Sequence, residues 1–510
     1  MSEKNRNARH VFTHYNMRSV PLCLLGVVWG IWIIIYILYS VALIQYPYDW
    51  EPGEGSKILY AQRLLENKPL YKSNNTFPML GNCYPPMYPL IVAALVKYAG
   101  PQMWCGRIVS FVAILLMMAM IYRIASRHNC SRVWGIVAAG CFAMPAFIAN
   151  WYSLARMDSL CSFFLLGMVY VVWEFPKFKY SSVVAGILAV CAVFTKQTAV
   201  FCIAGLGMYY LLSKQWRNLI AFCITGLVAG WLCFAVCNSL SDGWFYRNIM
   251  SENTHRLFFI ERYPAFFGAF FFSYPWAWII GIGVAAWKFY RRNVDIWFFY
   301  ACGGLVNALL IGANGSGPNY FFTLWSALAL FFAEGLALLY RWYSENTSTK
   351  PLYKYFVLYS LLAVLCTNWV NEGYGFFFQE TLMDYIPTGR SKKNMEQLEA
   401  LIRNEEGMVF VDRLPSLTLK YDKSGCYMEP ALIQELYYAE KWDPNPFIKM
   451  IEDRKCALIL LFSESLIPKP VKDAVKNNYL LSDRVEIDTF EIWRKRVVLI
   501  YRRPPDNFHR

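Results

Sequence analysis

Apolar segments about twenty residues long follow one another along most of this chain, and they constrain its fold more than any other feature. The first covers residues 20–43; it is too long for a signal-peptide core and lacks a small-residue cleavage site. Further segments lie at 101–123, 133–150, 158–174, 181–195, 198–213, 218–240, 264–286, 295–312, 320–340 and 355–371. Charged residues make up only 16% of the chain, against about 25% in a typical soluble domain. The sequence therefore predicts a polytopic α-helical membrane protein with about eleven transmembrane helices, and an interfacial helix at the shorter stretch 85–100.

The positively charged residues support this topology, because Lys and Arg in short loops mark the cytoplasmic side. They gather in the N-terminal tail, residues 1–19, and in every second loop: Lys4, Arg6, Arg9, Arg18, Arg123, Arg127, Arg132, Lys177, Lys179, Lys214, Arg217, Lys288, Arg291, Arg292, Arg341, Lys350 and Lys354. An odd number of crossings from a cytoplasmic N-terminus places the C-terminal end outside the inner (cytoplasmic) membrane. The net charge of +14 is then partly a consequence of topology, and acidic lipid headgroups explain it without nucleic acid as a partner.

The chain changes character near Pro387, where a polar break separates a membrane domain, residues 20–386, from residues 387–510. Helical patterns at 395–403 and 445–454, buried strands at 408–411 and 457–462, and an alternating segment at 486–501 predict a small extracytoplasmic α/β domain. It has no glycine-rich phosphate loop, so we interpret it as a cap or acceptor-docking domain. The 15 cysteines form no Cys-x-x-Cys pair and no Cys/His cluster at zinc spacing, so neither a metal nor a cofactor is predicted.

The first outer loop, residues 45–84, carries three carboxylates, Asp49, Glu51 and Glu54. A carboxylate just outside a membrane helix can act as a general base or bind a cation, although a solvated acidic loop has the same composition. Glycines on both sides of Glu54 suit a tight turn that aims one side chain. An amphipathic helical pattern follows at once, and such a helix can lie on the membrane surface.

Two cations lie close to the outer ends of predicted crossings. Arg156 and Asp158 stand at the junction of two crossings, where Arg156 can bind an anion such as phosphate; a structural ion pair is the alternative. Lys196, followed by Gln197, lies alone between two apolar helices on the side that is poor in positive charge. Either an anion in the site or snorkelling of the side chain to the interface explains that lysine.

Two other outer segments carry weaker signals. The mixed-charge loop 241–263 contains Arg247, His255, Arg256, Glu261 and Arg262, a composition that a solvated loop also has. The glycine-rich segment 312–321 offers the hydrogen-bonding groups of Asn319 and Tyr320, although a plain turn explains its glycines. Taken together, the outer face holds a candidate base and candidate cations. That combination suits transfer from a phosphorylated carrier in the membrane, with the cations stabilising the departing phosphate.

Several short motifs then occur in an order that resembles a known family. They are Glu54-Gly55 and the segments 61–65, 69–71, 84–89, 106–110, 155–158, 194–198 and 319–321. In this order they resemble the bacterial GT-C-fold membrane glycosyltransferases of the protein O-mannosyltransferase and aminoarabinose-transferase type, in a branch that is not characterised. The likeness spans most of the membrane body, and the C-terminal α/β domain is also similar to the domains that follow such bodies.

The resemblance implies a polyprenyl-phosphate-linked sugar donor and transfer of a hexosyl or pentosyl group outside the cytoplasmic membrane. The acceptor would be a hydroxyl of a glycolipid, polysaccharide or protein, and a single inverting displacement would need neither nucleotide nor metal. Family members often carry an Asp-Glu or Glu-Glu pair in the first outer loop, whereas Gly53 precedes Glu54 here. The base role therefore passes to Glu54, with Asp49 and Glu51 in reserve. The donor phosphate is assigned to Arg156, Lys196 and Arg256, and further substrate contacts to Asp158, Gln197, His255, Asn319 and Tyr320.

Two other functional classes stay open. A transporter or flippase of lipid-linked substrates would carry ionisable residues near the middle of the bilayer and an internal repeat, whereas here these residues cluster at one face. A non-catalytic assembly protein of envelope polysaccharide synthesis would keep the fold without the chemistry, and the missing second acidic residue fits that reading.

Overall fold

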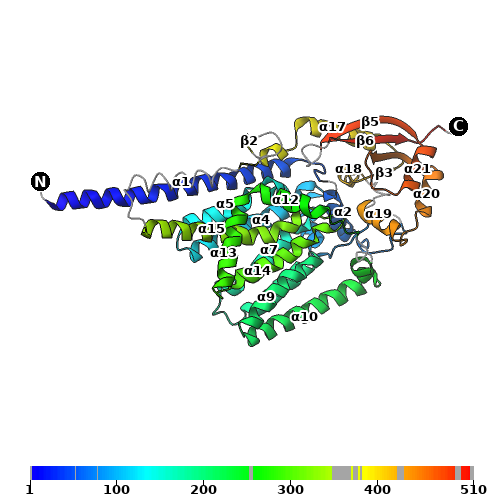
Figure 1. Ribbon diagram of the computed structural model, residues 1–510. Coiled ribbons are helices and arrows are strands. Elements are labelled where there is room, and N and C mark those ends of the chain that lie inside the picture. Colours follow the sequence, from blue (N-terminus) through cyan, green and yellow to red (C-terminus); the bar gives the residue numbers. More distant parts are fainter. Residues whose placement is uncertain are drawn as a thin grey trace.

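The computed structural model describes residues 3–51, 53–76, 79–251, 257–346, 369–370, 377–378, 382–421, 430–488 and 495–505. A bundle of helices makes up the body, and a smaller domain with a sheet sits at one end of it, next to the C-terminus (Figure 1). Five helices in the described part are long and apolar enough to span a membrane. They are α1 (Glu3–Gln45), α4 (Met103–His128), α7 (Met157–Glu174), α10 (Trp216–Ser239) and α15 (Phe322–Asn346). All five lie at positions predicted as crossings. The chain is thus a multi-pass membrane protein.

Shorter apolar helices occupy most of the other predicted segments. They are α5 (Arg132–Ala143), α8 (Ser181–Val193), α9 (Val200–Leu212) and α14 (Ile296–Ala308). The short stretch 85–100 forms α3 (Met87–Ala99), which packs against α4. The predicted segment 355–371 falls largely outside the described residues, so the count of about eleven crossings stays a prediction.

The predicted crossing at 264–286 is bent, because its residues do not form a single helix. The segment consists of α12 (Arg262–Ser273) and α13 (Pro275–Tyr290), which meet at 96°. Proline has no N–H to continue a helix and its ring disfavours helical backbone in the residue before it. Tyr274 accordingly has φ −161° and ψ 83°, and the helix restarts with Pro275 at its first position.

Helices of the body approach closely where glycines face a neighbour, as is common in membrane proteins. A Cβ on Gly140 of α5 would lie 2.3 Å from the Trp29 carbonyl oxygen of α1, and one on Gly303 of α14 would lie 2.6 Å from Cys202 Cα of α9. Larger side chains at these two positions would force the helix pairs apart.

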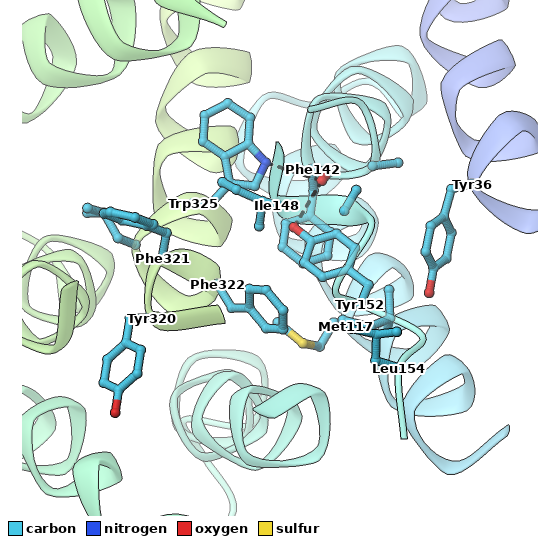
Figure 2. Packing of buried hydrophobic residues seen from close by; sticks show 14 of the residues in the cluster. Tyr36, Met117, Phe142, Ile148, Tyr152, Leu154, Tyr320, Phe321, Phe322 and Trp325 are labelled. Atoms are coloured by element: carbon cyan, nitrogen blue, oxygen red, sulfur yellow. Dashed lines mark hydrogen bonds between the residues drawn. The ribbon is translucent and has the colours of Figure 1, made fainter. Parts of the chain in front are cut away.

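An aromatic cluster in the core holds residues 150–156, the segment that leads into α7 (Figure 2). The Tyr152 ring stacks on Phe142 at 4.8 Å between centroids and meets the edge of Phe322 at 4.7 Å. The Tyr152 hydroxyl and the Trp325 indole N–H both donate to the Phe142 carbonyl oxygen, at 3.1 and 3.2 Å. These contacts fix residues 150–156, and with them the start of α7, to α5 and α15.

The C-terminal domain has one mixed sheet with the strand order β3–β4–β6–β5. Its strands are β3 (Met408–Val411), β4 (Cys456–Phe462), β5 (Leu480–Asp488) and β6 (Lys495–Arg502). β3, β4 and β6 lie where strands are predicted, whereas β5 begins before the predicted segment 486–501 and overlaps only its start. β3 and β4 are parallel, so the chain crosses over between them through α18 (Ser416–Leu419), α19 (Pro430–Tyr438) and α20 (Asn445–Glu452). The other two pairs are antiparallel. Helix α17 (Gly389–Asn404) lies before β3 and contacts β5, and α21 (Lys469–Asn478) connects β4 with β5.

The loop between α1 and α3 is shared between the body and this domain. Met79 and Cys83 belong to the hydrophobic core of the C-terminal domain, and the Trp442 indole donates to the Asn74 carbonyl oxygen at 3.2 Å. Tyr46, just after α1, meets Ser391 of α17 at 3.2 Å between hydroxyl oxygens. The helix predicted after residue 54 is α2 (Glu54–Leu65), but most of it is buried between α3, α4 and α18. Lying on a membrane surface is therefore the wrong description of α2.

Candidate functional site

The three carboxylates of the first loop are all buried, but each has different partners. Asp49 is 5% exposed, Glu51 is 8% exposed and Glu54 is fully buried. A solvated acidic loop, the alternative reading of this composition, is therefore excluded. A buried carboxylate needs a cation or hydrogen bonds, and those partners distinguish the three.

Glu54 is surrounded by donors on both of its oxygens. Arg107 binds it in a fork, with Nε 2.9 Å from Oε1 and Nη2 2.8 Å from Oε2. The backbone N–H groups of Trp50 and Glu51 donate to Oε2, at 2.9 and 3.1 Å, and that of Ala155 donates to Oε1 at 2.7 Å. Burial opposes ionisation, but the charge and hydrogen bonds of Arg107 outweigh it and lower the pKa of Glu54. Both oxygens of Glu54 are thus occupied by donors, and its contacts join α2 to α4 and to the segment before α7.

Arg107 extends the same ion pair to the end of α1. Its guanidinium also donates to the carbonyl oxygens of Leu43, Tyr46 and Tyr48, at 2.7, 2.5 and 2.7 Å. It therefore binds carbonyl oxygens in the last turn of α1 and in the residues just after it. The signal in the sequence was a lone arginine in the first turn of a membrane helix, and its role was missed because its carboxylate partner lies 53 positions away.

Asp49 connects the loop to the C-terminal domain. Its backbone N–H donates to Ser416 Oγ at 3.0 Å, and Oδ2 accepts from the Ser416 N–H at 2.9 Å. Oδ1 accepts from the Gly55 N–H at 2.6 Å. Burial raises the pKa of Asp49 to about 6, although the bonds from Ser416 and Gly55 act in the opposite direction.

The raised pKa of Asp49 predicts a pH effect on stability. Between about pH 4 and pH 6 the folded protein keeps a proton on Asp49 that the unfolded chain has released, so stability due to this group falls as the pH rises through that window. We expect Asp49→Asn to gain unfolding free energy relative to the wild type across the window, by at most about 3 kcal/mol. Denaturant unfolding in detergent at both ends of the window measures this difference. Parallel pH curves for the two proteins would contradict it.

Glu51 begins a line of four alternating charges. Its Oε2 lies 2.7 Å from Arg156 Nη1, Arg156 Nε lies 3.6 Å from Asp158 Oδ2, and Asp158 Oδ1 accepts from Lys196 Nζ at 2.7 Å. The four side chains come from the first loop, the residue before α7, the first turn of α7 and the turn after α8. The structure thus brings together the two outer cations singled out in the sequence and one of the three carboxylates. The pairing of Asp158 with Lys196 was not predicted.

Aromatic rings line these charges. Lys196 Nζ lies 3.8 Å from the centroid of the Tyr320 ring, and the Arg156 guanidinium lies 5.4 Å from that of Trp151. Tyr320 belongs to the short helix η5 (Pro318–Phe321), together with Asn319, whose side chain interacts with Asp158. The segment 312–321 is therefore part of the site and not merely a turn.

Two further residues of the site, Lys57 and Tyr84, were not singled out in the sequence. Lys57 of α2 is 4% exposed; its Nζ donates to Ser56 Oγ at 2.9 Å and lies 5.4 Å from the Tyr84 ring centroid. Tyr84 is within electrostatic reach of both Arg156 and Lys196. Lys57 stands three positions after Glu54, and this helical spacing was the signal that could have found it. Lys57 is thus connected to Arg156 and Lys196 through Tyr84.

Three buried atoms in this line make no hydrogen bond among the described residues: Arg156 Nε and Asp158 Oδ2, which face each other at 3.6 Å in the ion pair above, and Asn319 Oδ1. Buried polar atoms in proteins are normally paired, so a donor and two acceptors left at one place are typical of a site that receives a polar ligand or water. A hydroxyl group both donates and accepts, which matches this set.

The remaining candidates have other positions. Gln197 donates to the Cys83 carbonyl oxygen at 2.7 Å and so holds the first loop rather than facing the charges. His255 and Arg256 lie outside the described residues. Gly53 has φ +127°, a conformation that side-chain-bearing residues rarely adopt, which explains why no carboxylate precedes Glu54. Within the described ranges, no group of three His, Cys, Asp or Glu residues is placed to hold a metal ion.

Comparison with known proteins agrees with the resemblance inferred from the motifs. Residues 84–240 match the model of the dolichyl-phosphate-mannose-protein mannosyltransferase family. A search of curated protein sequences found no match. Among solved structures, the chain is similar to ArnT from Cupriavidus metallidurans bound to undecaprenyl phosphate, with 12% identity, a TM-score of 0.55, and coverage of 92% of this chain and 97% of ArnT. It is also similar to the Archaeoglobus fulgidus oligosaccharyltransferase in the apo form, with 9% identity, a TM-score of 0.52, and coverage of 87% and 69%. The predicted likeness to GT-C-fold glycosyltransferases is confirmed at the level of fold.

Proposed function

We propose that this chain is a membrane glycosyltransferase that moves a monosaccharide from a polyprenyl-phosphate donor to a hydroxyl acceptor. The observation that carries the proposal is the buried line of Glu51, Arg156, Asp158 and Lys196 at the end of the membrane helices. It offers a carboxylate base and cations together, next to the start of α7 and the end of α8. The fold is that of ArnT, whose crystal structure contains undecaprenyl phosphate, which supports a donor of the same chemical class.

Glu51 is the base in this proposal, in place of Glu54. Glu54 has both oxygens engaged by Arg107 and backbone N–H groups. Glu51 instead lies in the line of charges, where its Oε2 accepts from Arg156 Nη1 at 2.7 Å. Glu51 would take the proton from the acceptor hydroxyl as its oxygen forms a bond to the anomeric carbon of the sugar. The bond from that carbon to the phosphate oxygen breaks at the same time, and the electron pair leaves with the polyprenyl phosphate. A single displacement of this kind inverts the anomeric centre.

The cations would stabilise the negative charge that develops on the leaving phosphate. Lys196, Arg156 and Lys57 are all at least partly buried, where an electrostatic interaction is stronger than in water. Arg256 keeps its proposed role as a further phosphate ligand, and His255 as a substrate contact. Asp158 Oδ2 and Asn319 Oδ1, which make no hydrogen bond among the described residues, are the proposed contacts for sugar hydroxyls.

The ion pair between Glu51 and Arg156 gives the reaction an order. A donor phosphate at Arg156 would compete with the Glu51 carboxylate for the same guanidinium, at present 2.7 Å away. Once that partner is drawn to the phosphate, the carboxylate becomes more basic. Donor binding would therefore prepare Glu51 for the acceptor.

The proposal includes an orientation. The N-terminus lies in the cytoplasm, and the C-terminal domain and the site lie outside the cytoplasmic membrane, where the acceptor would be a glycolipid, a polysaccharide or a protein. The asymmetric distribution of Lys and Arg between alternate loops supports this arrangement.

A transfer assay with purified protein in lipid tests the function. The donors are a panel of polyprenyl-phosphate sugars and the acceptor is a membrane glycolipid extract. The Lys196→Met variant, combined with Asp158→Asn so that no buried charge is left alone, is expected to lose about 10²–10³-fold in rate, because one cation at the leaving phosphate is removed. Lys97→Met, at an exposed lysine of α3, is the matched control and should keep the wild-type rate.

Two outcomes would contradict the function. One is a full transfer rate in the double variant. The other is a folded wild type that transfers no sugar and whose melting temperature is not raised by polyprenyl phosphate, a result that would favour a transporter or an assembly protein.

A further inference from the structure

We propose that Asp49 and Ser416 form a latch through which the C-terminal domain positions Glu51, an inference that rests on the proposed function. The two residues are 367 positions apart in the chain and both are buried, at 5% and 6% exposed. They exchange two hydrogen bonds, one from each backbone N–H to the other's side chain. Reciprocal pairing of this kind fixes both the distance and the orientation of the two segments.

The latch includes a hydrogen bond that joins the two ends of the short segment containing Glu51. Asp49 Oδ1 accepts from the Gly55 N–H, so residues 49–55 form a loop whose two ends are joined at 2.6 Å. Glu51 lies inside that loop and donates its own N–H to Glu54. On the side of the membrane body, the loop is held by Glu54, which binds Arg107. On the side of the C-terminal domain, Asp49 is held by Ser416.

Gly55 permits the close contact on which the latch depends. A Cβ at this position would lie 2.7 Å from the Ser416 backbone nitrogen, 2.8 Å from Asp49 Oδ1 and 2.9 Å from Pro415 Cγ. Any larger residue would push the start of α18 away from α2. The domain and the loop are thus in close contact four residues after Glu51.

Other contacts of the same interface lie farther from Glu51 and provide a comparison. Trp442 is 3% exposed and donates to the Asn74 carbonyl oxygen at 3.2 Å, at the far side of the loop. If the domain merely stabilised the loop, loss of either contact would have similar consequences. If Asp49 and Ser416 position the base, only loss of the latch changes the catalytic step.

The test compares Ser416→Ala with Trp442→Phe in the transfer assay. We expect Ser416→Ala to lower kcat by about 10–100-fold with little change in KM, since a small displacement of a catalytic group has an effect of that order. Ser416→Thr, which keeps the hydroxyl, should recover most of kcat. Trp442→Phe should keep kcat within about twofold even if its melting temperature falls as much as that of Ser416→Ala. Equal losses of kcat in Ser416→Ala and Trp442→Phe, or none in Ser416→Ala, would overturn the latch.

A second measurement does not depend on activity, so failure of the latch is distinguishable from failure of the proposed function. Glu51→Cys is introduced alone, with Ser416→Ala and with Trp442→Phe, and its modification by a charged thiol reagent is followed at the peptide that contains residue 51. Faster modification is expected only with Ser416→Ala. An unchanged rate there would overturn the latch whether or not the wild type transfers sugar.

Discussion

A Glu51→Gln variant is expected to lose sugar transfer by about 10²–10⁴-fold while it keeps its fold, which is the contribution that general bases usually make. The amide has the shape of the carboxylate, and its oxygen can still accept the hydrogen bond from Arg156 that the carboxylate accepts at 2.7 Å. It cannot take a proton from the acceptor hydroxyl. The measurement is the initial rate of transfer at saturating donor, with the melting temperature in detergent as the check on folding.

Glu54→Gln is the matched comparison, because it makes the same chemical change three residues away. Its expected consequence is a less stable protein, since the amide places an N–H₂ group against the donors that now surround the carboxylate. The fraction that folds should keep a transfer rate closer to that of the wild type than Glu51→Gln does. The reverse pattern, with full transfer by Glu51→Gln and none by well-folded Glu54→Gln, would return the base role to Glu54.

The choice between these carboxylates shows what the sequence cannot supply. The flanking glycines of Glu54 were read as a turn that aims its side chain, and they do shape the turn. The direction of the side chain, however, depends on Arg107 and Ala155, which are 53 and 101 positions away in the chain. No local pattern specifies such partners. Glu51 belongs to the same loop as Glu54. It is the better candidate base because it lies next to Arg156, in the line of charges.

The membrane helices were easier to predict, because a long apolar segment has few alternatives in lipid. Most predicted segments contain a helix in the structure, and three of the four strands in the sheet of the C-terminal domain lie where buried or alternating patterns were read; β5 begins earlier than predicted. The break at Tyr274 was missed because hydropathy continues across it, even though Pro275 is visible in the sequence. Apolar content predicts that a segment is buried in lipid, whereas the backbone chemistry of proline decides whether it stays straight.

The cations of the site could be singled out in the sequence because a charged residue next to apolar helices is energetically unfavourable. The partners of these cations could not be predicted. Lys196 was singled out because a lysine at that end of the membrane helices needs a reason, and the structure supplies one in Asp158 at 2.7 Å. Lys57 lies in a helix that was interpreted as amphipathic and at the surface. A lysine is common in such a helix, so Lys57 was not considered as a site residue. The burial of α2 under α18 changes that interpretation, and it follows from contacts between segments more than 300 residues apart.

Arg107→Lys is expected to destabilise the folded protein by about 3–5 kcal/mol, the usual consequence of breaking a buried ion pair. The lysine keeps the charge but has no planar fork, so it cannot bind both Glu54 oxygens and three carbonyls at once. Unfolding by denaturant in mild detergent gives the free energy, and Arg63→Lys in α2, whose guanidinium bonds only the Pro69 carbonyl oxygen among the hydrogen bonds of the described residues, is the matched control.

A double-mutant cycle then separates the ion pair from the other contacts of Arg107. If the fork to Glu54 carries most of the effect, Arg107→Lys combined with Glu54→Gln will be clearly less destabilised than the sum of the two single changes, because each alone already breaks the pair. If the two effects simply add, the carbonyl contacts at the end of α1 carry the stability instead. In that case Glu54 is not locked by Arg107, and the argument that removes it from the chemistry loses its physical basis. The cycle therefore tests the assignment of the base through Glu54, the carboxylate that was rejected for that role.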